Sequence, residues 1–440
     1  MSTPTTARSV NRRGRRRLLF AATAVTALVA AAGCGGGDSG GGDSGGTTTL
    51  TFVNAQDPGT FDKVIASFQT ANPTIKIEQQ AVPFDDLNST VQSRLGSKDP
   101  GIDLYDVDEP RLAAFASRGF LEPLDDLRQQ AEGKIDPNAL KITTFDGKQY
   151  AMPRWTSSQL LYYNKALLAK ANVTAPSSDP KSPMTWEQVV AAGKRAQAGG
   201  AKNGLIFDQV DRYYQLQPLA ESLGGGPGVS GAGLLEPDVG NAGWTKAFTW
   251  YHSIFADGVA PRGISPEQTP GLFASGNTAF FAGGPWNAAA FDKDNAVDYG
   301  VAPFPRFAEG KPASSTDSWS TGISPFSRNK DAAKKFLSYM TINATGATET
   351  ISNNIPVQKQ AFEKYLSDLG GRGARYQQIA DIVEYALANT SVSRPTTTGF
   401  VDFESVMNKA FADIRNGTQP TARLSQATEE LDRALAKYRK

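Results

Sequence analysis

The stretch "TLTFVNAQDPGTFDKVIASFQTANPTIKI" (residues 49–77) sets the pattern of the fold. Its first six residues alternate between apolar and polar side chains, as in a half-buried β-strand. The next apolar residues recur at helical spacing, at Phe61, Val64, Ile65 and Phe68. Asn72-Pro73 ends this helix, and Ile75 and Ile77 mark a second strand. The stretch therefore predicts a strand–helix–strand unit.

The same alternation continues to residue 107. Leu87, Val91 and Leu95 predict a second helix, and residues 102–107 predict a third strand. Strands that alternate with helices form a parallel sheet through right-handed crossovers. The opening of the chain therefore predicts an α/β domain with a parallel sheet.

Later segments predict further strands and helices. Asp146-Gly147 indicates the turn of a hairpin over residues 141–152, and Thr185-Trp186-Glu187-Gln188 forms a capping box that opens a helix ended by Gly199. Residues 278–287 predict a strand, a tight turn and the start of a helix. The remaining expected elements are strands at residues 160–164, 204–207 and 320–327, a helix at residues 331–340, and helices through the C-terminal part.

The N-terminal segment is typical of an exported protein. Five arginines between residues 12 and 17 precede an apolar run of residues 18–32, which is shorter than the ~20 residues that span a bilayer. Small residues then lead to Cys34, the single cysteine. This order resembles a bacterial lipoprotein signal, in which the cysteine is acylated and becomes the new N-terminus. Both the general secretory route and a twin-arginine route remain open. Residues 35–46 contain only Gly, Asp and Ser, so we expect a flexible tether.

Charge and composition exclude several function classes. Removal of residues 1–33 would leave 39 basic and 44 acidic residues, and this acidic balance argues against a nucleic-acid partner. One histidine, His252, and one cysteine cannot form a zinc site or a histidine-based catalytic triad. We therefore expect no cofactor and no metal.

Carboxylates cluster in "DLYDVDEP" (residues 103–110), at the end of the third expected strand. Asp106 and Glu109 could serve a glycoside hydrolase as a pair of carboxylates. Asp108 and Glu109 could instead accept hydrogen bonds from sugar hydroxyls, or cap the helix that starts near Pro110. These three readings stay open at this point.

Three tryptophans stand beside glycine or polar residues in predicted turns. They are Trp155, after the hairpin, Trp286, after Gly283-Gly284-Pro285, and Trp319, in "STDSWSTG". An indole in such a loop can stack on the apolar face of a sugar ring while its neighbours bind the hydroxyls, although each could also be a packing residue.

Several segments together carry a resemblance to a known family. The order and spacing of five pieces, at residues 146–168, 185–196, 279–291, 319–340 and 393–411, resemble the sugar-binding lipoproteins of ABC importers, the extracellular solute-binding proteins of family 1. The resemblance implies an α/β fold of two lobes (a periplasmic-binding-protein-like fold of class II), with a hinge and the ligand in the cleft. It implies crossovers near Arg154–Ser157, near Thr316–Ser320 and around Ser367.

These crossovers divide the chain into expected parts. Residues 1–33 would be the signal peptide, and residues 34–48 the lipidated cysteine and linker. Residues 49–155 plus 318–366 would form lobe one, and residues 156–317 plus 367–440 lobe two. The resemblance also implies a set of ligand contacts at matching positions: Asn54, Gln56, Asp57, Asp108, Glu109, Arg154, Trp155, Ser157, Tyr214, Gly284, Trp286, Trp319, Arg394 and Phe400. Phe400 departs from the family pattern, because several similar members have tyrosine there.

The resulting expectation is a monomeric, non-enzymatic receptor at the outer face of the cell membrane. It would be anchored by a lipid at Cys34, capture a di- or oligosaccharide by hinge closure, and deliver it to the permease subunits of an ABC importer. The alternatives are a secreted glycoside hydrolase and a binding protein for a non-sugar solute such as a polyol or a peptide.

Overall fold

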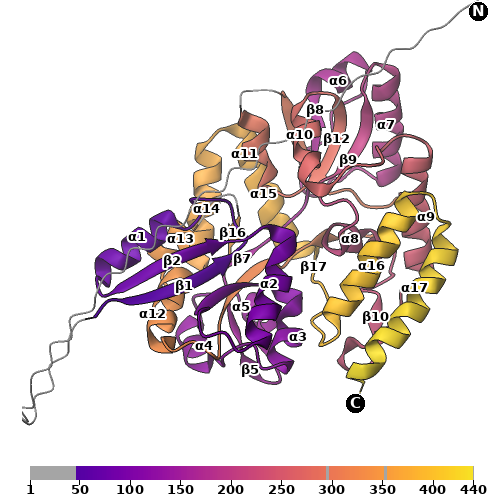
Figure 1. Ribbon diagram of the computed structural model, residues 1–440. Coiled ribbons are helices and arrows are strands. Elements are labelled where there is room, and N and C mark those ends of the chain that lie inside the picture. Colours follow the sequence, from indigo (N-terminus) through magenta and orange to yellow (C-terminus); the bar gives the residue numbers. More distant parts are fainter. Residues whose placement is uncertain (1–45, 294–296, 351–353, 440) are drawn as a thin grey trace, which may run out of the picture. The chain divides into compact units, whose positions relative to one another are not determined.

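The computed structural model describes residues 46–293, 297–350 and 354–439, which form a single unit (Figure 1). The expected signal peptide, Cys34 and nearly all of the linker lie outside the described residues. Within this unit, two mixed sheets each have their own helices. We call the part around the first sheet lobe one and the part around the second sheet lobe two.

The sheet of lobe one has the strand order β2-β1-β3-β15-β6. Strand β1 (Thr48–Asn54) pairs in parallel with β2 (Ile75–Ala81) and β3 (Leu104–Asp108), as the opening sequence predicts. Strands β15 (Trp319–Ile323) and β6 (Ala151–Pro153) are antiparallel to their neighbours. The parallel pairing predicted for the opening strands is therefore confirmed, and β15 and β6 add two antiparallel strands from later parts of the chain.

Helices cover the sheet of lobe one because their apolar faces match it. Phe68 of α1 (Asp62–Ala71) and Phe52 of β1 both contact Phe336 of α12 (Lys330–Thr341), with ring centroids 5.1 and 6.3 Å away. Leu87, Val91 and Leu95 of α2 (Phe84–Gly96) are buried in a second cluster. The other elements of this lobe are η1 (Glu109–Arg111), α3 (Leu112–Ser117), α4 (Asp125–Ala131), α5 (Pro137–Ile142), β4 (Thr144–Phe145), β5 (Lys148–Gln149) and α13 (Ala344–Glu349).

The sheet of lobe two has the strand order β13-β8-β12-β9. Strand β8 (Leu160–Asn164) is antiparallel to β13 (Tyr299–Pro303) and β12 (Thr278–Gly283), whereas β12 and β9 (Asn203–Phe207) are parallel. All residues of these four strands are buried, so both faces of the sheet are covered by helices.

The helices of lobe two begin and end where the sequence provides signals. The predicted capping box is present, because the Thr185 hydroxyl accepts a hydrogen bond from the Gln188 N–H at the start of α7 (Trp186–Ala198). The other elements of this lobe are α6 (Lys165–Lys170), α8 (Tyr213–Ser222), β10 (Val229–Ser230), η2 (Ala232–Leu234), β11 (Glu236–Pro237), α9 (Ala242–Ala256), η3 (Pro266–Gln268), α10 (Thr269–Ala274), α11 (Asn287–Asp292), α14 (Lys359–Gly371), α15 (Ala374–Asn389), α16 (Phe400–Arg415), α17 (Pro420–Leu435) and η5 (Ala436–Tyr438).

Two local predictions need correction. The hairpin keeps its turn, with Asp146 and Gly147 at φ values of 46° and 76°, but its strands β4 and β5 have two residues each because helix α5 continues to Ile142. The strand expected over residues 320–327 ends at Ile323. There the Ser324 N–H donates to the Asp103 carbonyl and the chain turns toward α12.

The crossover segments lie side by side. Strand β7 (Trp155–Thr156) pairs with β16 (Ile355–Pro356), and β14 (Ser314–Ser315) pairs in parallel with β17 (Ser391–Val392). Residue 367 falls inside the continuous helix α14, whose Tyr365 and Leu369 pack with the core of lobe two. The packing therefore places the third crossover beside β16, before α14, and not around Ser367.

Candidate functional site

A cleft with a volume of about 510 Å³ lies between the two lobes. Phe84, Asp108, Arg111 and Trp319 line it from lobe one, and Tyr214, Trp286 and Glu404 line it from lobe two. Cavities of roughly 300–1,000 Å³ with a few placed polar groups are typical of small-molecule sites. The cleft therefore has the size and the two-sided lining of a ligand-binding site.

Each lobe contributes a pair of aromatic rings to the cleft. In lobe two, the ring centroids of Tyr214 and Trp286 are 6.4 Å apart, with an interplanar angle of 45°. In lobe one, the rings of Phe84 and Trp319 meet edge to face, with centroids 5.6 Å apart. Because Trp286 and Trp319 are only half-buried, part of each indole faces the cleft.

The turn between β12 and α11 positions Trp286. The preceding Gly284 is required there, because a Cβ atom at that position would overlap the six-membered ring of Trp286. The Gly284 carbonyl accepts a hydrogen bond of 2.8 Å from the Tyr162 hydroxyl, which fixes the turn to the sheet. Gly284 therefore acts through the position of the indole and does not itself line the cleft.

Asp208 lies next to Trp286 in the wall of the cleft. It directly follows β9, and its Oδ2 accepts hydrogen bonds from Trp286 Nε1 (3.0 Å) and Asn287 Nδ2 (2.8 Å). The side chain is buried, and burial raises the pKa of Asp208 to about 6. At neutral pH the carboxylate is ionised and holds the indole in place.

Arg394 joins the lobes beside this aromatic pair. Its guanidinium donates to both carboxylate oxygens of Asp108, at 2.7 and 3.1 Å, which is the bidentate geometry that arginine favours. Its backbone N–H and Nε donate to Asp317, at 2.9 and 3.3 Å. Asp317 is buried in a crossover segment, with a positive φ of 58°. Burial raises the pKa of Asp317 to about 6, against the opposing effect of Arg394.

Two further arginines carry charge across the cleft. Arg111 of lobe one pairs with Glu404 of α16 and lies 3.3 Å from Asp108. Arg212 of lobe two pairs with Asp85 of α2, at 3.0 Å, and with Glu267, also at 3.0 Å. Together with the Arg394–Asp108 pair, these contacts link the two lobes through three ion pairs in which the arginine and a carboxylate come from different lobes.

The structure brings together seven of the fourteen residues that the family resemblance implied. Those that line the cleft are Asp57, Asp108, Ser157, Tyr214, Trp286, Trp319 and Arg394. Ser157 is placed through its hydroxyl, which bonds to the Tyr214 hydroxyl at 2.7 Å and to the Asp317 carbonyl at 2.7 Å. The cleft is thus built around the crossover segments, as the resemblance implied.

Two of the remaining residues lie in the core of lobe one. Trp155 is fully buried and stacks on Phe61, with ring centroids 5.9 Å apart. Arg154 lies over the Trp155 ring and forms an ion pair of 2.8 Å with Asp106. Both residues are held by packing and charge pairing inside the lobe. We therefore leave them out of the proposed site.

Asn54 and Gln56 also stand back from the cleft lining. Asn54 is buried, and its Oδ1 accepts a hydrogen bond from the Gln56 backbone N–H at 3.1 Å. The Gln56 side chain reaches Asp106 at 3.4 Å. These two residues shape the loop after β1, which presents Asp57 to the cleft.

Phe400 and Glu109 likewise do not line the cleft. Phe400 is fully buried and packs edge-on against Tyr213, with centroids 6.2 Å apart, so it serves the core of lobe two. Glu109 Oε2 accepts a hydrogen bond of 2.7 Å from the Ser318 N–H, and the side chain lines a separate groove of about 900 Å³ that includes Thr156 and Thr316. Burial raises the pKa of Glu109 well above the usual range.

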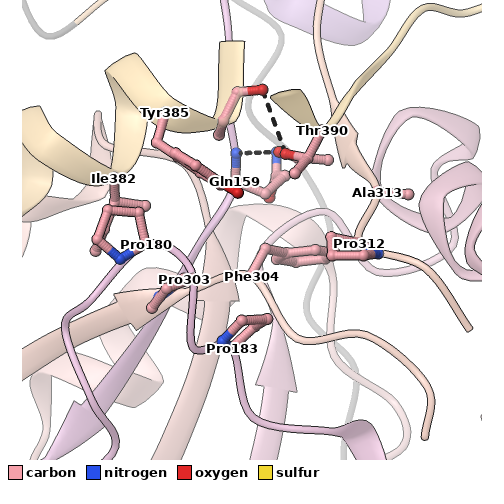
Figure 2. Close-up of a pocket in the computed structure, with 12 residues that line it drawn as sticks. Gln159, Pro180, Pro183, Pro303, Phe304, Pro312, Ala313, Ile382, Tyr385 and Thr390 are labelled. Carbon is pink, nitrogen blue, oxygen red and sulfur yellow. Dashed lines mark hydrogen bonds between the residues drawn. The ribbon is translucent and has the colours of Figure 1, made fainter. Parts of the chain in front are cut away.

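A small pocket near the crossovers is of a different kind. It has a volume of about 20 Å³ and lies between Gln159, Phe304, Tyr385 and several prolines (Figure 2). That volume holds about one water molecule and no sugar ring. In the described part of the chain, no group of three or more His, Cys, Asp or Glu residues is placed to hold a metal ion.

Several cleft residues escaped the sequence analysis: Asp208, Asp317, Arg111, Arg212 and Glu404. Asp208 had a usable signal, because it directly follows the predicted strand at residues 204–207, and ligands bind beyond the carboxyl ends of such strands. Arg111 and Glu404 are 293 residues apart and meet only through the docking of α16 on η1 and α3. No local pattern predicts that contact.

Asp208 yields a prediction about pH. A carboxyl group with a higher pKa in the folded than in the unfolded protein binds more protons when folded, so its contribution to stability falls as pH rises from about 4 to 6. Replacing Asp208 by Asn removes this contribution. We expect the wild type to lose on the order of 2–3 kcal/mol more unfolding free energy than Asp208→Asn over that interval.

Urea denaturation at a series of pH values measures this difference. The matched control is Asp257→Asn, an exposed carboxylate paired with Lys194, whose profile is expected to follow that of the wild type. Parallel profiles for the wild type and Asp208→Asn would contradict the assignment.

Comparison with known proteins identifies the family. The family profile described as "Bacterial extracellular solute-binding protein" matches residues 63–368. The chain belongs to this family. Members are non-enzymatic binding receptors, and the protein is a solute-binding component of an ABC transporter, as the sequence predicted. No helix among the described residues is long and apolar enough to cross a bilayer.

Curated relatives are similar over most of the chain. A putative binding protein of Brucella abortus is 25% identical, with 88% of this chain and 93% of the relative covered. The galactooligosaccharide-binding protein of Bacillus subtilis is 24% identical, with coverages of 72% and 76%. The maltodextrin-binding protein of the same organism is 25% identical, with coverages of 69% and 73%.

Solved structures confirm the fold. An ABC substrate-binding protein of Listeria monocytogenes, in complex with cycloalternan, has a TM-score of 0.77 and 23% identity, covering 89% of this chain and 99% of that one. The GacH receptor of Streptomyces glaucescens, solved unliganded and with acarbose, has a TM-score of 0.76 and 22% identity, covering 89% and 100%. The predicted two-lobed periplasmic-binding-protein fold is therefore correct.

Proposed function

We propose that the protein captures a di- or oligosaccharide in the cleft and delivers it to the permease subunits of an ABC importer. The observation that carries this proposal is the pair of aromatic rings on each lobe, Tyr214 with Trp286 and Phe84 with Trp319, set among charged hydrogen-bonding groups. Aromatic faces cover the apolar faces of sugar rings, and the polar groups between them bind hydroxyls. Two such platforms suit more than one ring.

Other observations support the same class of ligand. Two relatives carry names that state binding of galactooligosaccharides and maltodextrin, and the two structural neighbours are described in complex with cycloalternan and acarbose. The alternative of a glycoside hydrolase is not retained, because the family is non-enzymatic and because Asp106 is fully buried in its ion pair with Arg154.

A binding panel tests the proposal. Isothermal titration calorimetry with neutral and amino-substituted disaccharides and oligosaccharides, polyols and short peptides is expected to find saccharides as the tight binders. If a polyol or a peptide is the tight binder, the protein is a receptor for a non-sugar solute. If none of the compounds in the panel gives a binding signal, the saccharide proposal is overturned.

The mechanism we propose is hinge closure at the crossover segments, with a monomeric receptor. Ligand contacts to both lobes stabilise the closed arrangement relative to an open one. We expect a saturating bound saccharide to lower the radius of gyration in small-angle scattering at constant molecular mass. An unchanged radius with a saccharide that binds by calorimetry would contradict closure, and a doubled mass would contradict the monomer.

We further propose that a lipid on Cys34 anchors the receptor to the outer face of the cell membrane, with residues 35–46 as the tether. In the natural host, Cys34→Ser is expected to move the protein from the membrane fraction into the medium, because the acyl chain is the proposed membrane contact. Saccharide affinity is expected to stay within about twofold, since the change lies outside the cleft. Full membrane retention of Cys34→Ser would exclude the anchor.

A further inference from the structure

The cleft contains more carboxylates than cations. Its lining includes seven acidic side chains (Asp57, Asp85, Asp108, Asp208, Glu267, Asp317 and Glu404) and three basic ones, Arg111, Arg212 and Arg394. The lining therefore holds an excess of four acidic side chains. The balance of residues 34–440 does not explain this excess, since their 39 basic and 44 acidic residues differ by five over 407 positions.

The three arginines are already shared between carboxylates. Arg394 binds Asp108 and Asp317 with four hydrogen bonds between 2.7 and 3.3 Å. Arg111 lies between Glu404 and Asp108, and Arg212 lies between Asp85 and Glu267. Each guanidinium therefore serves two acids, and none is left to neutralise the remaining carboxylates.

Asp208 is the buried carboxylate that these arginines do not pair. Its Oδ2 accepts hydrogen bonds from the neutral groups Trp286 Nε1 and Asn287 Nδ2, and the neutral hydroxyl of Thr269 is a further hydrogen-bond partner of the side chain. Arg212 is the cation that acts on it electrostatically, but the guanidinium of Arg212 is bonded to Asp85 and Glu267. A buried anion held only by neutral donors is poorly compensated, which leaves Asp208 as an acceptor for a cation.

Trp286 reinforces this preference. Its indole N–H donates to the Asp208 carboxylate, a charge-assisted hydrogen bond that increases the electron density of the ring. An electron-rich indole face attracts a cation within about 6 Å of its centroid. The same part of the cleft lining thus offers a carboxylate and an electron-rich aromatic ring to a positive group.

We propose that the ligand is an oligosaccharide that carries a protonated amine, with its ammonium group bound by Asp208 next to Trp286. This inference rests on the proposed function and narrows its ligand class. A neutral saccharide removes water from the unpaired carboxylates and returns only hydrogen bonds. An ammonium group also supplies the missing charge, so the same sugar scaffold binds more tightly with an amine than with a hydroxyl.

Matched saccharides that differ at one group test the proposal. The pairs are cellobiose with the glucosamine disaccharide of chitosan, and trehalose with its 2-amino-2-deoxy derivative, and N,N′-diacetylchitobiose serves as the form with an amide in place of the amine. We expect at least one amine to bind about tenfold or more tightly than its hydroxyl partner, and acetylation to abolish the gain. Raising NaCl from 50 to 500 mM is expected to weaken binding of the amine several-fold more than that of the neutral partner, through screening.

Variants identify the group responsible. Asp208→Asn is expected to reduce the preference for the amine to less than about threefold, whereas Asp298→Asn, an exposed carboxylate outside the cleft, is expected to keep it. The salt dependence of the wild type gives an independent measurement if Asp208→Asn fails to fold.

The outcomes separate this inference from the proposed function. Equal or tighter binding of the neutral saccharides would overturn the cationic ligand and leave a saccharide receptor. A preference for the amine that Asp208→Asn does not reduce would overturn its assigned position. If no saccharide binds, neutral or amino, in this test or in the wider panel, both the cationic ligand and the proposed saccharide receptor are overturned.

Discussion

Replacing Arg394 by Ala is expected to lower the unfolding free energy by about 3–5 kcal/mol, because it removes the cation that pairs with buried Asp317 and leaves Asp108 with Arg111 alone. The guanidinium is 5% exposed, Asp108 is 11% exposed and Asp317 is fully buried. Removing one partner of a buried ion pair retains the desolvation penalty of the others and loses the attraction that offset it. The loss is expected to be largest above about pH 6, where Asp317 is ionised in the wild type.

Chemical denaturation at pH 7.5 and at pH 5 measures the change. The matched control is Arg433→Ala, because Arg433 is 69% exposed and faces Glu429 at 4.0 Å, and we expect it to change stability by less than about 0.5 kcal/mol. A loss for Arg394→Ala as small as that of the control would mean that the pair with Asp108 and Asp317 is not formed in solution.

A second substitution at this position tests the link between the lobes apart from stability. Arg394 follows β17 on the side of lobe two, whereas Asp108 ends β3 in lobe one. Conservative Arg394→Lys keeps a charge but not the bidentate geometry. We therefore expect Arg394→Lys to recover part of the stability and to leave the radius of gyration less responsive to a bound saccharide than in the wild type.

The fold was largely predictable because its signals are local. The alternation of residues 49–54, the helical spacing after Phe61 and the capping box at Thr185 all lie within a few residues of the elements they define. The antiparallel strands β15 and β6 were not predictable in this way, because their direction depends on crossovers between distant parts of the chain. The third crossover was misplaced for the same reason.

The site was predictable only where a residue occupies a strand end or a turn. Asp108 and Trp286 do so, and both line the cleft. Trp155 has a sequence context similar to that of Trp286, since it follows Pro153-Arg154 in a predicted turn, yet it packs on Phe61 in the core. The residues next to a tryptophan in the sequence do not show whether its ring faces the core of a lobe or the cleft. Contacts with distant parts of the chain cover Trp155: its packing on Phe61 and the pairing of β7 with β16.

These two tryptophans give the second large prediction, as a comparison. Trp286→Ala is expected to weaken saccharide binding by about 2 kcal/mol or more, as for aromatic anchors in other interfaces. That loss corresponds to a dissociation constant about thirtyfold higher. The turn through Gly284 and Pro285 holds the indole before the ligand arrives, so little conformational entropy is lost on binding and the full contact is available to the ligand.

Trp155→Ala is expected to behave in the opposite way. Its ring is fully buried and packs against Phe61 and Arg154, so truncation leaves a cavity and is expected to lower the unfolding free energy by roughly 3–5 kcal/mol. Trp286 is half-buried, and its removal is expected to lower stability by less, although the Asp208 carboxylate loses one donor. Under conditions in which Trp155→Ala stays folded, we expect its affinity for the saccharide to remain within a few-fold of the wild-type value, since the ring does not line the cleft.

Calorimetry with a saccharide from the panel, together with urea denaturation, measures both quantities for both variants. Trp286→Phe is the informative intermediate, because it keeps an aromatic face but removes the N–H that donates to Asp208. We expect it to recover part of the affinity for a neutral saccharide and less of the affinity for an amino-saccharide. Near-normal affinity for Trp286→Ala combined with a large loss of stability would show that Trp286 is a core residue, because the indole would then contribute to folding and not to ligand binding.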